Sequence, residues 1–317
     1  MSTSEKPHIL VTAPWYQAAM DELPNFFTVH RLDTASDPEA LLAEVKDKVV
    51  GLAGSHDMKI NGALMDKLPN LKVVSNFGVG YDNVDVEAAT AHGLKVGNTP
   101  DVLNDCVADL ALGLVLATCR KIPQADRYVR DGKWESVGNM AFTTRVHHRK
   151  VGILGLGRIG QEIADRCAGF KMEIGYHTRS KRDVPYTYYA SLLEMAREVE
   201  ILIAIVPGGA ATKHIINREI LDALGPQGVL INVARGSVVD EQALIEALRD
   251  GRLGAAGLDV FEAEPKVPQA LRDLSDRTVL QPHQASATHD TRMGMGRMVI
   301  DNLRAAIEGR PMPSQVN

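Results

Sequence analysis

The sequence has few cysteines, no long apolar run and no excess of basic residues. Its 3 cysteines are odd in number and lack metal-ligand spacing, so we expect reduced, mostly buried thiols in a cytoplasmic protein. No run of about 18 apolar residues predicts a membrane span, and the N-terminus lacks the basic and apolar segments of a secretion signal. The formal net charge of -5 argues against a nucleic-acid partner. An anionic ligand must therefore be met by a few locally placed cations.

What the chain does contain is typical of a soluble globular protein, with 45% hydrophobic and 24% charged residues. Its 317 residues fit two domains of ordinary size better than one core. Over residues 1–100, short apolar runs alternate with segments whose apolar positions recur at a helical period. The apolar runs lie at 8–13, 48–54, 71–78 and 94–98, and the helical segments at 14–23, 37–48, 60–68 and 84–93. This alternation predicts parallel strands with crossover helices, and therefore an α/β class.

A long apolar helix is predicted over 102–122, of the kind that is buried between two domains or lines a subunit interface. A polar, turn-rich segment follows over 130–150, and strand–helix alternation then restarts. A last helix over 290–309 is expected to return to the first domain. We therefore predict that one α/β domain, 100–287, is inserted in another made of 1–99 and 288–317.

A glycine-rich turn follows the first strand of the predicted inserted domain. The sequence VGILGLGRIG places a GxGxxG pattern directly after an apolar run and at the start of a helical segment. The first glycine permits a tight turn, the second lets a pyrophosphate approach the backbone, and the third allows close helix–strand packing. The arginine inside the turn either reaches a phosphate or lies in solvent. The expected cofactor-binding residues of this turn are Gly155, Leu156, Gly157, Arg158, Ile159 and Gly160.

The second strand lacks the acidic residue that an NAD site carries about 20 residues after the turn. Cations stand there instead, at positions 179, 181 and 182. A 2′-phosphate adds negative charge that a carboxylate would repel, and arginine offers a planar donor fork suited to its oxygens. We therefore predict NADP(H) as the cofactor; a basic surface loop that contacts no ligand is the alternative. The expected 2′-phosphate site consists of His177, Thr178, Arg179 and Ser180.

Four polar residues follow later predicted strands. Arg235, Asp259 and His283 stand at strand ends, and Glu264 lies just beyond the second of these strands. Ligands of open α/β sheets bind outside the carboxyl ends of the strands, so these side chains are expected to converge. Three of them also have an ordinary alternative: a capping ion pair for Arg235, a solvated acid before a proline for Glu264, and a satisfied histidine for His283.

The order and spacing of several motifs resemble the D-isomer-specific 2-hydroxyacid dehydrogenase family. The motifs are LGLGRIG, NVARGSVVDEQALIEAL, AGLDVFEAEP and QPHQASAT, and the upstream NFGVGYDNVD is similar to the family's substrate-domain loop. The similarity covers nearly the whole chain. It implies a Rossmann-type dinucleotide-binding domain inserted in a flavodoxin-like substrate domain. The non-acidic YHTRS further resembles the NADP-preferring glyoxylate/hydroxypyruvate reductase branch.

The resemblance implies catalytic roles for Arg235, Glu264 and His283, and elementary chemistry agrees. Reduction of a 2-oxo acid needs a cation that holds the carboxylate and polarises the ketone, which suits Arg235. It also needs an acid that protonates the developing alkoxide as a hydride reaches the carbon. His283 is suited because imidazole titrates near physiological pH. Glu264 is expected to orient that ring and to stabilise its protonated form.

The same resemblance implies further binding residues. The backbone N–H groups of Val79 and Gly80 would bind the substrate carboxylate, with Ser55 beside them, and Asp259 would hold the nicotinamide carboxamide. Gly209 stands where relatives carry a hydroxyl residue, so we expect no side-chain contact there. The remaining expected cofactor contacts are Val206, Pro207, Val233 and Ala234.

The residues together predict NADPH-dependent reduction of small 2-oxo acids, glyoxylate and hydroxypyruvate first, to 2-hydroxy acids. Reduction of aryl-pyruvates such as hydroxyphenylpyruvate is the alternative within the enzyme class, because the sequence does not fix the width of the pocket. A nucleotide-sensing corepressor or scaffold on the same fold is the alternative from another class. Turnover of several 2-oxo acids separates these readings.

The segment 130–142 resembles a family dimer arm, so a homodimer is expected. Trp134 in this segment either packs within its own subunit or reaches the partner's substrate site. His147 and His148 lie beside basic residues and lack acidic or thiol neighbours in the sequence, so we expect a solvated turn there and no metal site.

Overall fold

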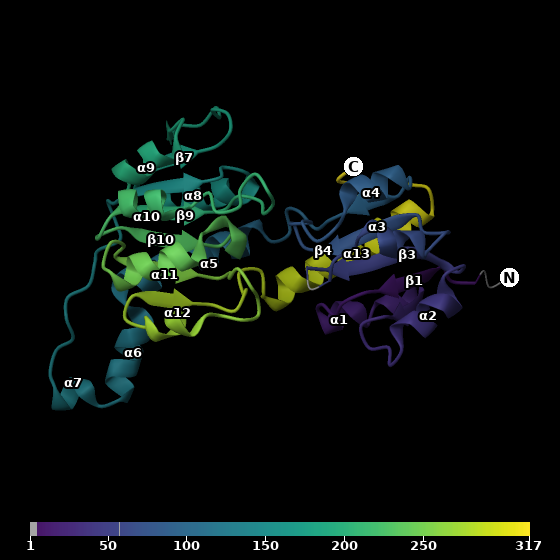
Figure 1. Ribbon diagram of the computed structural model, residues 1–317, viewed down its shortest axis with the longest axis horizontal. Coiled ribbons are helices and arrows are strands. Elements are labelled where there is room, and N and C mark those ends of the chain that lie inside the picture. The colour runs from purple at the N-terminus through teal and green to yellow at the C-terminus, as the bar shows by residue number, and fades with distance from the viewer. Residues whose placement is uncertain (1–4, 57) are drawn as a thin grey trace. The chain divides into compact units, whose positions relative to one another are not determined.

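The computed structural model describes residues 5–56 and 58–317. The chain forms two compact units (Figure 1). The first unit contains the residues up to Leu103 together with Thr288–Asn317, and the second unit is Asn104–Ala287. The second unit is therefore inserted in the first. The boundary expected between residues 99 and 100 falls in the irregular segment just before the second unit. Among the described residues, no helix has the length and apolarity that a membrane span requires.

The first unit is built on a parallel five-stranded sheet. Its strands are β1 (His8–Val11), β2 (Thr28–Arg31), β3 (Val49–Ser55), β4 (Val73–Phe77) and β5 (Lys95–Gly97). They are arranged in the order β2-β1-β3-β4-β5, and all neighbours pair in parallel. This 2-1-3-4-5 order is that of flavodoxin-like folds, so the expected fold class of this part is confirmed. The central strands are apolar and buried on both faces, as a parallel sheet between helices requires.

One strand of this sheet does not follow from the apolar pattern. β2 has the sequence TVHR, and all four of its side chains are half-buried. It lies at the edge of the sheet and pairs only with β1. An edge strand gains its order from one neighbour and needs no continuous apolar face, so its sequence carries no strong signal.

The helices of the first unit cover this sheet. They are α1 (Gln17–Met20), η1 (Leu23–Asn25), α2 (Pro38–Val45), α3 (Gly62–Asp66), α4 (Val86–Ala91) and α13 (His289–Ile307). α13, which follows the second unit in the chain, packs on β3 and β4. Gly51 in β3 makes room for it, because a Cβ at this position would lie only 3.1 Å from Leu303.

The second unit is built on a parallel seven-stranded sheet. Its strands are β6 (Lys150–Leu154), β7 (Glu173–His177), β8 (Thr187–Tyr188), β9 (Ile201–Ala204), β10 (Val229–Asn232), β11 (Ala255–Leu258) and β12 (Thr278–Leu280). The order is β12-β11-β10-β9-β6-β7-β8. The chain runs from β6 to β7 and β8 on one side and then crosses to β9 on the other. Open α/β sheets bind ligands at such a point of reversal, at the carboxyl ends of the strands.

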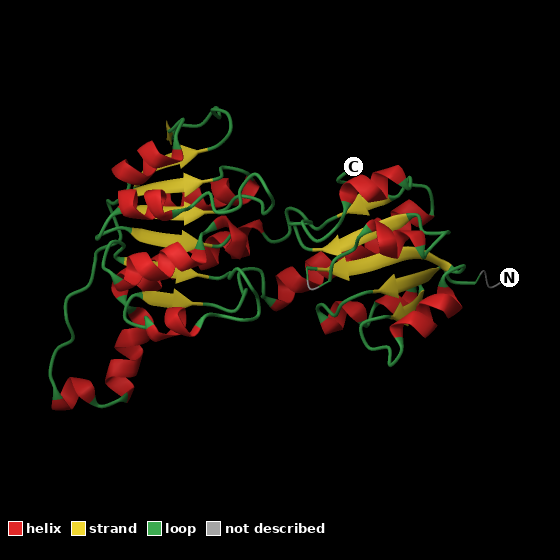
Figure 2. Cartoon of the chain, viewed as in Figure 1, coloured by secondary structure: helices red, strands yellow, loops and turns green. Residues whose placement is uncertain are grey.

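Helices flank both faces of this sheet (Figure 2). They are α5 (Asn104–Arg120), α6 (Ile122–Arg130), α7 (Lys133–Ser136), α8 (Arg158–Gly169), α9 (Leu192–Glu198), α10 (Arg218–Leu224), η2 (Gly236–Val238), α11 (Glu241–Arg249) and α12 (Gln269–Asp273). α5 packs beside α8, and α10 packs between α9 and α11. α7 lies in the segment 130–150 that the sequence pattern predicts as polar and turn-rich, and α6 lies just before it. The two helices lead away from the sheet as an arm (Figure 1).

Candidate active site

The turn between β6 and α8 leaves open space in front of one glycine only. Gly155 has φ +100°, and a Cβ there would lie 2.7 Å from the carbonyl oxygen of Ile205, just after β9. A Cβ at Gly160 would lie 2.2 Å from the carbonyl oxygen of Gly155. Gly157, in contrast, has nothing within 4 Å of a Cβ position. Two glycines therefore serve close packing, and the third leaves the backbone open to an approaching group.

The start of α8 also differs from that of most other helices. Seven helices begin at a residue whose side-chain oxygen accepts a backbone N–H of the first turn, the preferred N-cap. These residues are Asp37, Asn61, Asp85, Ser191, Asn217, Asp240 and Thr288. The N-cap of α8 is Gly157, which has no side chain to do this. Its first-turn N–H groups therefore suit a phosphate, which the helix dipole also favours.

The loop after β7 is exposed and basic, and hydrogen bonds from the buried Tyr176 hydroxyl hold it in place. The buried Tyr176 hydroxyl donates to the carbonyl oxygen of Arg182 at 3.1 Å and accepts from its N–H at 2.8 Å. The Thr178 hydroxyl donates to the carbonyl oxygen of Ser180 at 2.7 Å, which tightens the loop. His177 Nδ1 lies 2.9 Å from the carbonyl oxygen of Tyr189. Arg179 is exposed, and no described residue pairs with it. The loop therefore offers a guanidinium and hydroxyl groups where an NAD site carries a carboxylate.

Arg235 lies in a tight turn directly after β10. Its Nη1 donates to the carbonyl oxygen of Ala234 at 2.8 Å. The buried side chain of Asn232 brackets the same turn, since its Nδ2 donates to the Arg235 carbonyl at 3.0 Å and its Oδ1 accepts from Ala234 N–H at 3.0 Å. At Gly236 a Cβ would overlap the backbone of Phe261, so this turn lies against the segment after β11. The position therefore requires glycine, and the contact brings the Arg235 turn beside the segment that carries Glu264.

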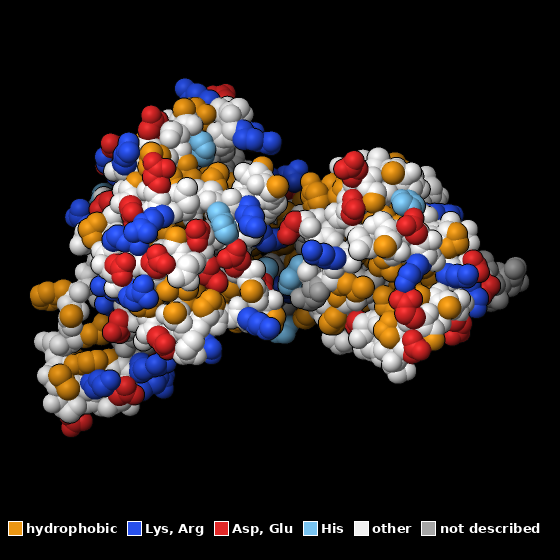
Figure 3. Space-filling model, in the orientation of Figure 1, with side chains coloured by type: hydrophobic (Ala, Val, Ile, Leu, Met, Phe, Trp, Pro, Cys, Tyr) orange, Lys and Arg blue, Asp and Glu red, His pale blue; other side chains and the backbone are white. Residues whose placement is uncertain are grey.

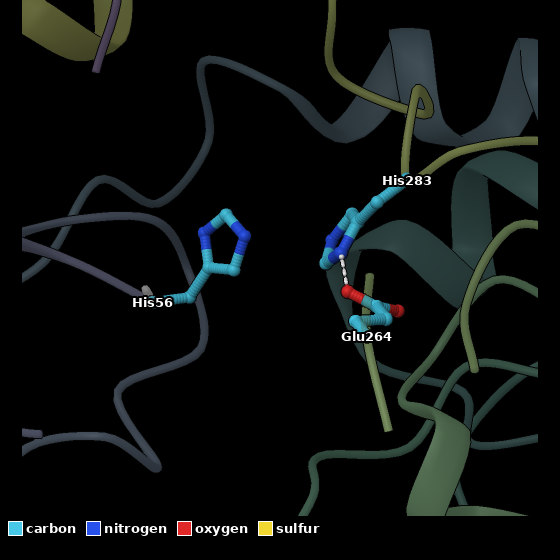
Figure 4. A group of neighbouring side chains, drawn as sticks. All are labelled: His56, Glu264 and His283. Atoms are coloured by element: carbon cyan, nitrogen blue, oxygen red, sulfur yellow. Dashed lines mark hydrogen bonds and ion pairs between the residues drawn. The ribbon is translucent and has the colours of Figure 1, made fainter. Parts of the chain in front are cut away.

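Glu264 and His283 form a direct pair (Figure 4). His283 Nδ1 lies 2.8 Å from Glu264 Oε2, and the side chains are each 27% exposed. The other carboxylate oxygen, Oε1, accepts the N–H of Phe261 at 2.9 Å, which fixes the carboxylate. Because Nδ1 is engaged by the carboxylate, Nε2 is the ring nitrogen on the other side of the pair. The pairing expected from the sequence is present.

Asp259, the first residue after β11, ties the His283 segment to the sheet. Its carboxylate accepts the N–H of Gln284 at 2.6 Å and of Ala285 at 3.0 Å. Its carbonyl oxygen accepts the N–H of His283 at 2.8 Å. Burial raises the pKa of this carboxyl, although the two N–H groups oppose the shift. Asp259 therefore holds the backbone of the histidine.

The residues after β9 lie against the glycine turn. A Cβ at Gly155 would lie 2.9 Å from Val206 Cγ1, so the Val206 side chain is at the point where the strand order reverses. Gly209 has φ +124°, a conformation that side chains disfavour, and it offers no side-chain contact. The hydroxyl of Thr212 donates instead to the carbonyl oxygen of Pro207 at 2.6 Å.

The three expected catalytic residues follow three adjacent strands of the second unit. Arg235 comes after β10, Glu264 after β11 and His283 after β12, and these strands are neighbours in the sheet. Their carboxyl ends are at one edge because all the pairings are parallel. Val233 and Ala234 are buried in the same turn as Arg235. The second unit thus gathers a cation, an imidazole and its carboxylate partner at the edge that bears the glycine turn.

In the first unit, the loop after β4 exposes two unpaired backbone donors. The N–H groups of Val79 and Gly80 donate to no residue that the structure describes. Ser55, at the end of the neighbouring β3, is buried, and its hydroxyl lies 3.4 Å from the carbonyl oxygen of Pro14. Adjacent unpaired N–H groups form an anion site, so this loop suits a carboxylate.

Comparison with known proteins decides the family. The family model for the D-isomer specific 2-hydroxyacid dehydrogenase NAD binding domain matches residues 112–285. The chain is 42% identical over 309 residues to glyoxylate/hydroxypyruvate reductase A of Arabidopsis thaliana, covering 97% of this chain and 98% of the relative. It is 44% identical, with the same coverage, to hydroxyphenylpyruvate reductase of Plectranthus scutellarioides.

A solved structure agrees over both units. The NADPH-dependent glyoxylate/hydroxypyruvate reductase of Sinorhizobium meliloti, solved in complex with NADP and malonate, aligns with a TM-score of 0.93 and 45% identity. The alignment covers 98% of this chain and 97% of that one. The chain belongs to the D-isomer specific 2-hydroxyacid dehydrogenase family. The resemblance and the Rossmann-type second unit expected from the sequence are thereby confirmed.

Several side chains of this dehydrogenase that support the site carry no sequence motif. Asn232 braces the Arg235 turn, as described above. In the first unit, Asn83 Nδ2 donates to Asn76 Oδ1 at 3.0 Å and to the carbonyl oxygen of Ser55 at 2.9 Å. Asn76 Nδ2 donates in turn to the Gly80 carbonyl at 2.9 Å. The one available signal is an asparagine at the end of a buried strand, where an amide needs partners.

Other residues singled out in the sequence lie away from the dehydrogenase's site residues. Trp134 on α7 is 62% exposed, and its Nε1 donates to Asn139 Oδ1 at 3.3 Å. His147 and His148 are exposed in the turn before β6, with their rings in an edge contact at 5.1 Å. The described contacts of these histidines therefore give no ligand cluster.

Proposed function

We propose that this dehydrogenase reduces small 2-oxo acids, glyoxylate and hydroxypyruvate foremost, to 2-hydroxy acids with NADPH. The observation that carries the proposal is the pair of His283 and Glu264 at 2.8 Å, after strands adjacent to the one that bears Arg235. A proton donor with a fixed carboxylate partner and a neighbouring cation is what ketone reduction needs. Relatives with these printed activities match over nearly the whole chain.

The chain's own residues supply binding and proton transfer. The hydride for the keto carbon would come from bound NADPH, which would be oxidised to NADP⁺. Arg235 holds the substrate carboxylate and polarises the ketone, so negative charge on its oxygen is stabilised as it develops. Protonated His283 donates its Nε2 proton to that oxygen, which completes the alcohol. The Glu264 carboxylate stabilises the imidazolium and fixes the ring for this transfer.

The remaining expected residues would bind the two ends of the cofactor and the substrate. The glycine turn and the first turn of α8 suit the pyrophosphate, because Gly157 leaves its backbone open. Arg179, with Thr178 and Ser180, suits the 2′-phosphate. The unpaired N–H groups of Val79 and Gly80 suit the substrate carboxylate. The expected further cofactor contacts are His177, Val206, Pro207, Val233, Ala234 and Asp259.

The test of the catalytic assignment uses two matched substitutions. His283 has φ +54°, and His214 has φ +51° and also pairs with a glutamate, Glu262, at 2.7 Å. Asparagine tolerates this backbone conformation, so His283→Asn and His214→Asn are both expected to fold. His283→Asn should lower kcat by about 10²- to 10⁴-fold, the usual value of a general acid, and should leave NADPH binding intact by fluorescence titration. His214→Asn should retain most activity.

The assignment is wrong if the His283 variant turns over nearly as fast as the unmodified protein. Equal losses in both variants would also contradict it, because they would point to a folding role shared by the two histidine–glutamate pairs. Circular dichroism of each variant guards against simple unfolding.

A second substrate class, the aryl-pyruvates, is the other candidate. It is favoured by the 44% identity to a hydroxyphenylpyruvate reductase over 97% of this chain. The ranking of kcat/KM among glyoxylate, hydroxypyruvate and hydroxyphenylpyruvate decides between the two classes. The proposal predicts that the aryl substrate ranks last.

We also propose a homodimer formed through the arm. Of the large apolar side chains exposed in the described residues, most lie in the arm and the chain directly after it, residues 122–142, and orange side chains gather over the arm in Figure 3. They are Ile122, Val129, Trp134, Val137 and Phe142. Exposed large apolar side chains that gather in one segment are typical of a protein interface. Light scattering should give twice the chain mass of 34.4 kDa at micromolar concentration; the mass of one chain across the whole range would refute the dimer.

We also propose that the protein resides in a reducing compartment, the cytoplasm. The cysteines form no disulfide, and burial raises the pKa of the Cys167 thiol to about 12 and also raises that of Cys119. Such thiols are weakly nucleophilic. Titration of the denatured protein without reductant should therefore find three thiols, and fewer would contradict the proposal.

A further inference from the structure

Three consecutive carbonyl groups of the loop after β4 each accept a hydrogen bond from another part of the first unit. The Gly78 carbonyl accepts the N–H of Thr99 at 3.0 Å. The Val79 carbonyl accepts Asn98 Nδ2 at 2.9 Å, and the Gly80 carbonyl accepts Asn76 Nδ2, also at 2.9 Å. These three hydrogen bonds therefore restrict the rotation of the peptide planes that follow Gly78, Val79 and Gly80.

The anchoring of the carbonyls sets the direction of the N–H groups. In a planar trans peptide, the C=O of one residue and the N–H of the next point in opposite directions. The bonds to Thr99 and Asn98 therefore direct the N–H groups of Val79 and Gly80 away from the segment after β5, and the bond to Asn76 directs the Tyr81 N–H away from that β4 side chain. None of these three N–H groups donates to a residue that the structure describes. Unpaired N–H groups on successive residues suit an anion.

Asn98 is itself oriented by the C-terminal segment, residues 310–317. The Ser314 hydroxyl donates to Asn98 Oδ1 at 2.5 Å. An amide has one acceptor end and one donor end, so this bond turns the NH₂ end toward the Val79 carbonyl. Asn302, fully buried on α13, fastens both partners, because its Nδ2 donates to the Asn98 carbonyl at 3.0 Å and its Oδ1 accepts Ser314 N–H at 3.0 Å.

The same segment has a second anchor on β5 that does not involve Asn98. Asn317 Oδ1 accepts the N–H of Val96 at 2.9 Å, and its Nδ2 donates to the Leu94 carbonyl at 2.9 Å. The N–H of Val316 donates to the Val96 carbonyl at 2.8 Å. Asn317 therefore fastens the segment without a hydrogen bond to Asn98, whereas the Ser314 hydroxyl bonds to the Asn98 amide. A substitution at Asn317 can serve as the control for one at Ser314.

We propose that the C-terminal segment positions the carboxylate-binding loop: Ser314 orients Asn98, and Asn98 holds the Val79 peptide so that the Gly80 N–H faces the substrate carboxylate. Ser314 and Asn98 are thus positioning residues that act on the substrate through the loop. This inference rests on the proposed function, because it takes the ligand of the loop to be the carboxylate of a 2-oxo acid.

The experiment measures Ser314→Ala in the full-length protein. Loss of this hydroxyl removes one hydrogen bond, so KM should rise about 3- to 10-fold. The factor should be the same for glyoxylate, hydroxypyruvate and phenylpyruvate, because all three share the carboxylate. KM for NADPH should not change, and kcat should change less than KM. Ser314→Thr keeps the hydroxyl and should restore KM. Calorimetric titration with oxalate should show the same loss of affinity without any need for turnover.

Asn317→Ala is the matched control. It removes more hydrogen bonds from the same segment, so it should lower Tm more than Ser314→Ala while leaving KM for the 2-oxo acids unchanged. The inference is overturned if Ser314→Ala leaves both KM and oxalate affinity unchanged, or if Asn317→Ala raises KM as strongly. If the unmodified protein reduces no 2-oxo acid but oxalate affinity still falls in Ser314→Ala, the positioning role holds and the proposed function fails.

Discussion

At the scale of single residues, the expected proton donor is held in a backbone conformation that side chains disfavour. His283 has φ +54°, which costs on the order of 1 kcal/mol or more for a residue with a side chain. Its N–H is bonded to the Asp259 carbonyl and its ring to Glu264, so its surroundings fix it from two sides. Strain of this kind persists where the structure over-determines a geometry, and it is common at active sites.

The choice of cofactor also belongs to this scale, and Arg179 is its test. The guanidinium is exposed, and no described residue pairs with it, so a 2′-phosphate would gain a charge-assisted hydrogen bond that NADH cannot offer. Arg179→Ala should raise KM for NADPH by about 10- to 100-fold and leave KM for NADH nearly unchanged. Arg197→Ala, which removes an exposed arginine on α9, is the control. Equal changes for both cofactors would contradict a 2′-phosphate role.

At the scale of elements, the glycines of the β6–α8 turn have different roles: Gly155 and Gly160 allow close packing, and Gly157 leaves space for a ligand. Gly160→Ala places a Cβ against the Gly155 carbonyl, so this variant should lose stability and lower Tm. Gly157→Ala has open space and an ordinary φ of -82°, so it should keep its Tm and lose affinity for NADPH. Gly113→Ala in α5 also meets nothing within 4 Å and serves as the control.

The expected effect of the Gly113 control is a gain of up to about 1 kcal/mol in helix stability, with unchanged NADPH binding. Thermal denaturation and fluorescence titration of all three variants give the readout. If Gly157→Ala binds NADPH as tightly as the unmodified protein, the open space is not the phosphate site.

The elements differ in how well the sequence predicts them. The central strands were foreseeable because a parallel strand buried on both faces reads as a continuous apolar run, as in β3 and β9. β2 and the two-residue β8 lie at sheet edges, where pairing with one neighbour suffices and the sequence stays polar. α6 begins at Ile122, has Pro123 in its first turn and has no buried residue, so its order does not come from a core pattern.

The residues of the candidate site also differ in how well the sequence predicts them. Chemistry constrains residues that are expected to touch a ligand, so residue type, place after a strand and the family motifs singled out Arg235, Glu264 and His283. The asparagines that orient the loops, such as Asn98 and Asn232, act through amide directions that only coordinates reveal. Their partners are also far apart in sequence, as with Asn98 and Ser314.

At the scale of the whole molecule, two α/β units share one chain, and the chain returns to the first unit through α13. The second unit carries the glycine turn and the His283–Glu264 pair, and the first carries the loop with unpaired N–H groups. An oxidoreductase of this family needs both a cofactor and a 2-oxo acid, and the proposed function assigns the two sets of residues to these two requirements. Cofactor preference and substrate ranking therefore test the whole molecule together.

The most direct measurement is a set of initial rates with NADPH and NADH, each against glyoxylate, hydroxypyruvate and phenylpyruvate. We expect kcat/KM with NADPH to exceed that with NADH by about tenfold or more, as one charge-assisted contact implies, and glyoxylate or hydroxypyruvate to rank above phenylpyruvate. A preference for NADH would contradict the role of the basic loop. The absence of turnover with every pair would contradict the reductase itself and favour a nucleotide-sensing protein on the same fold.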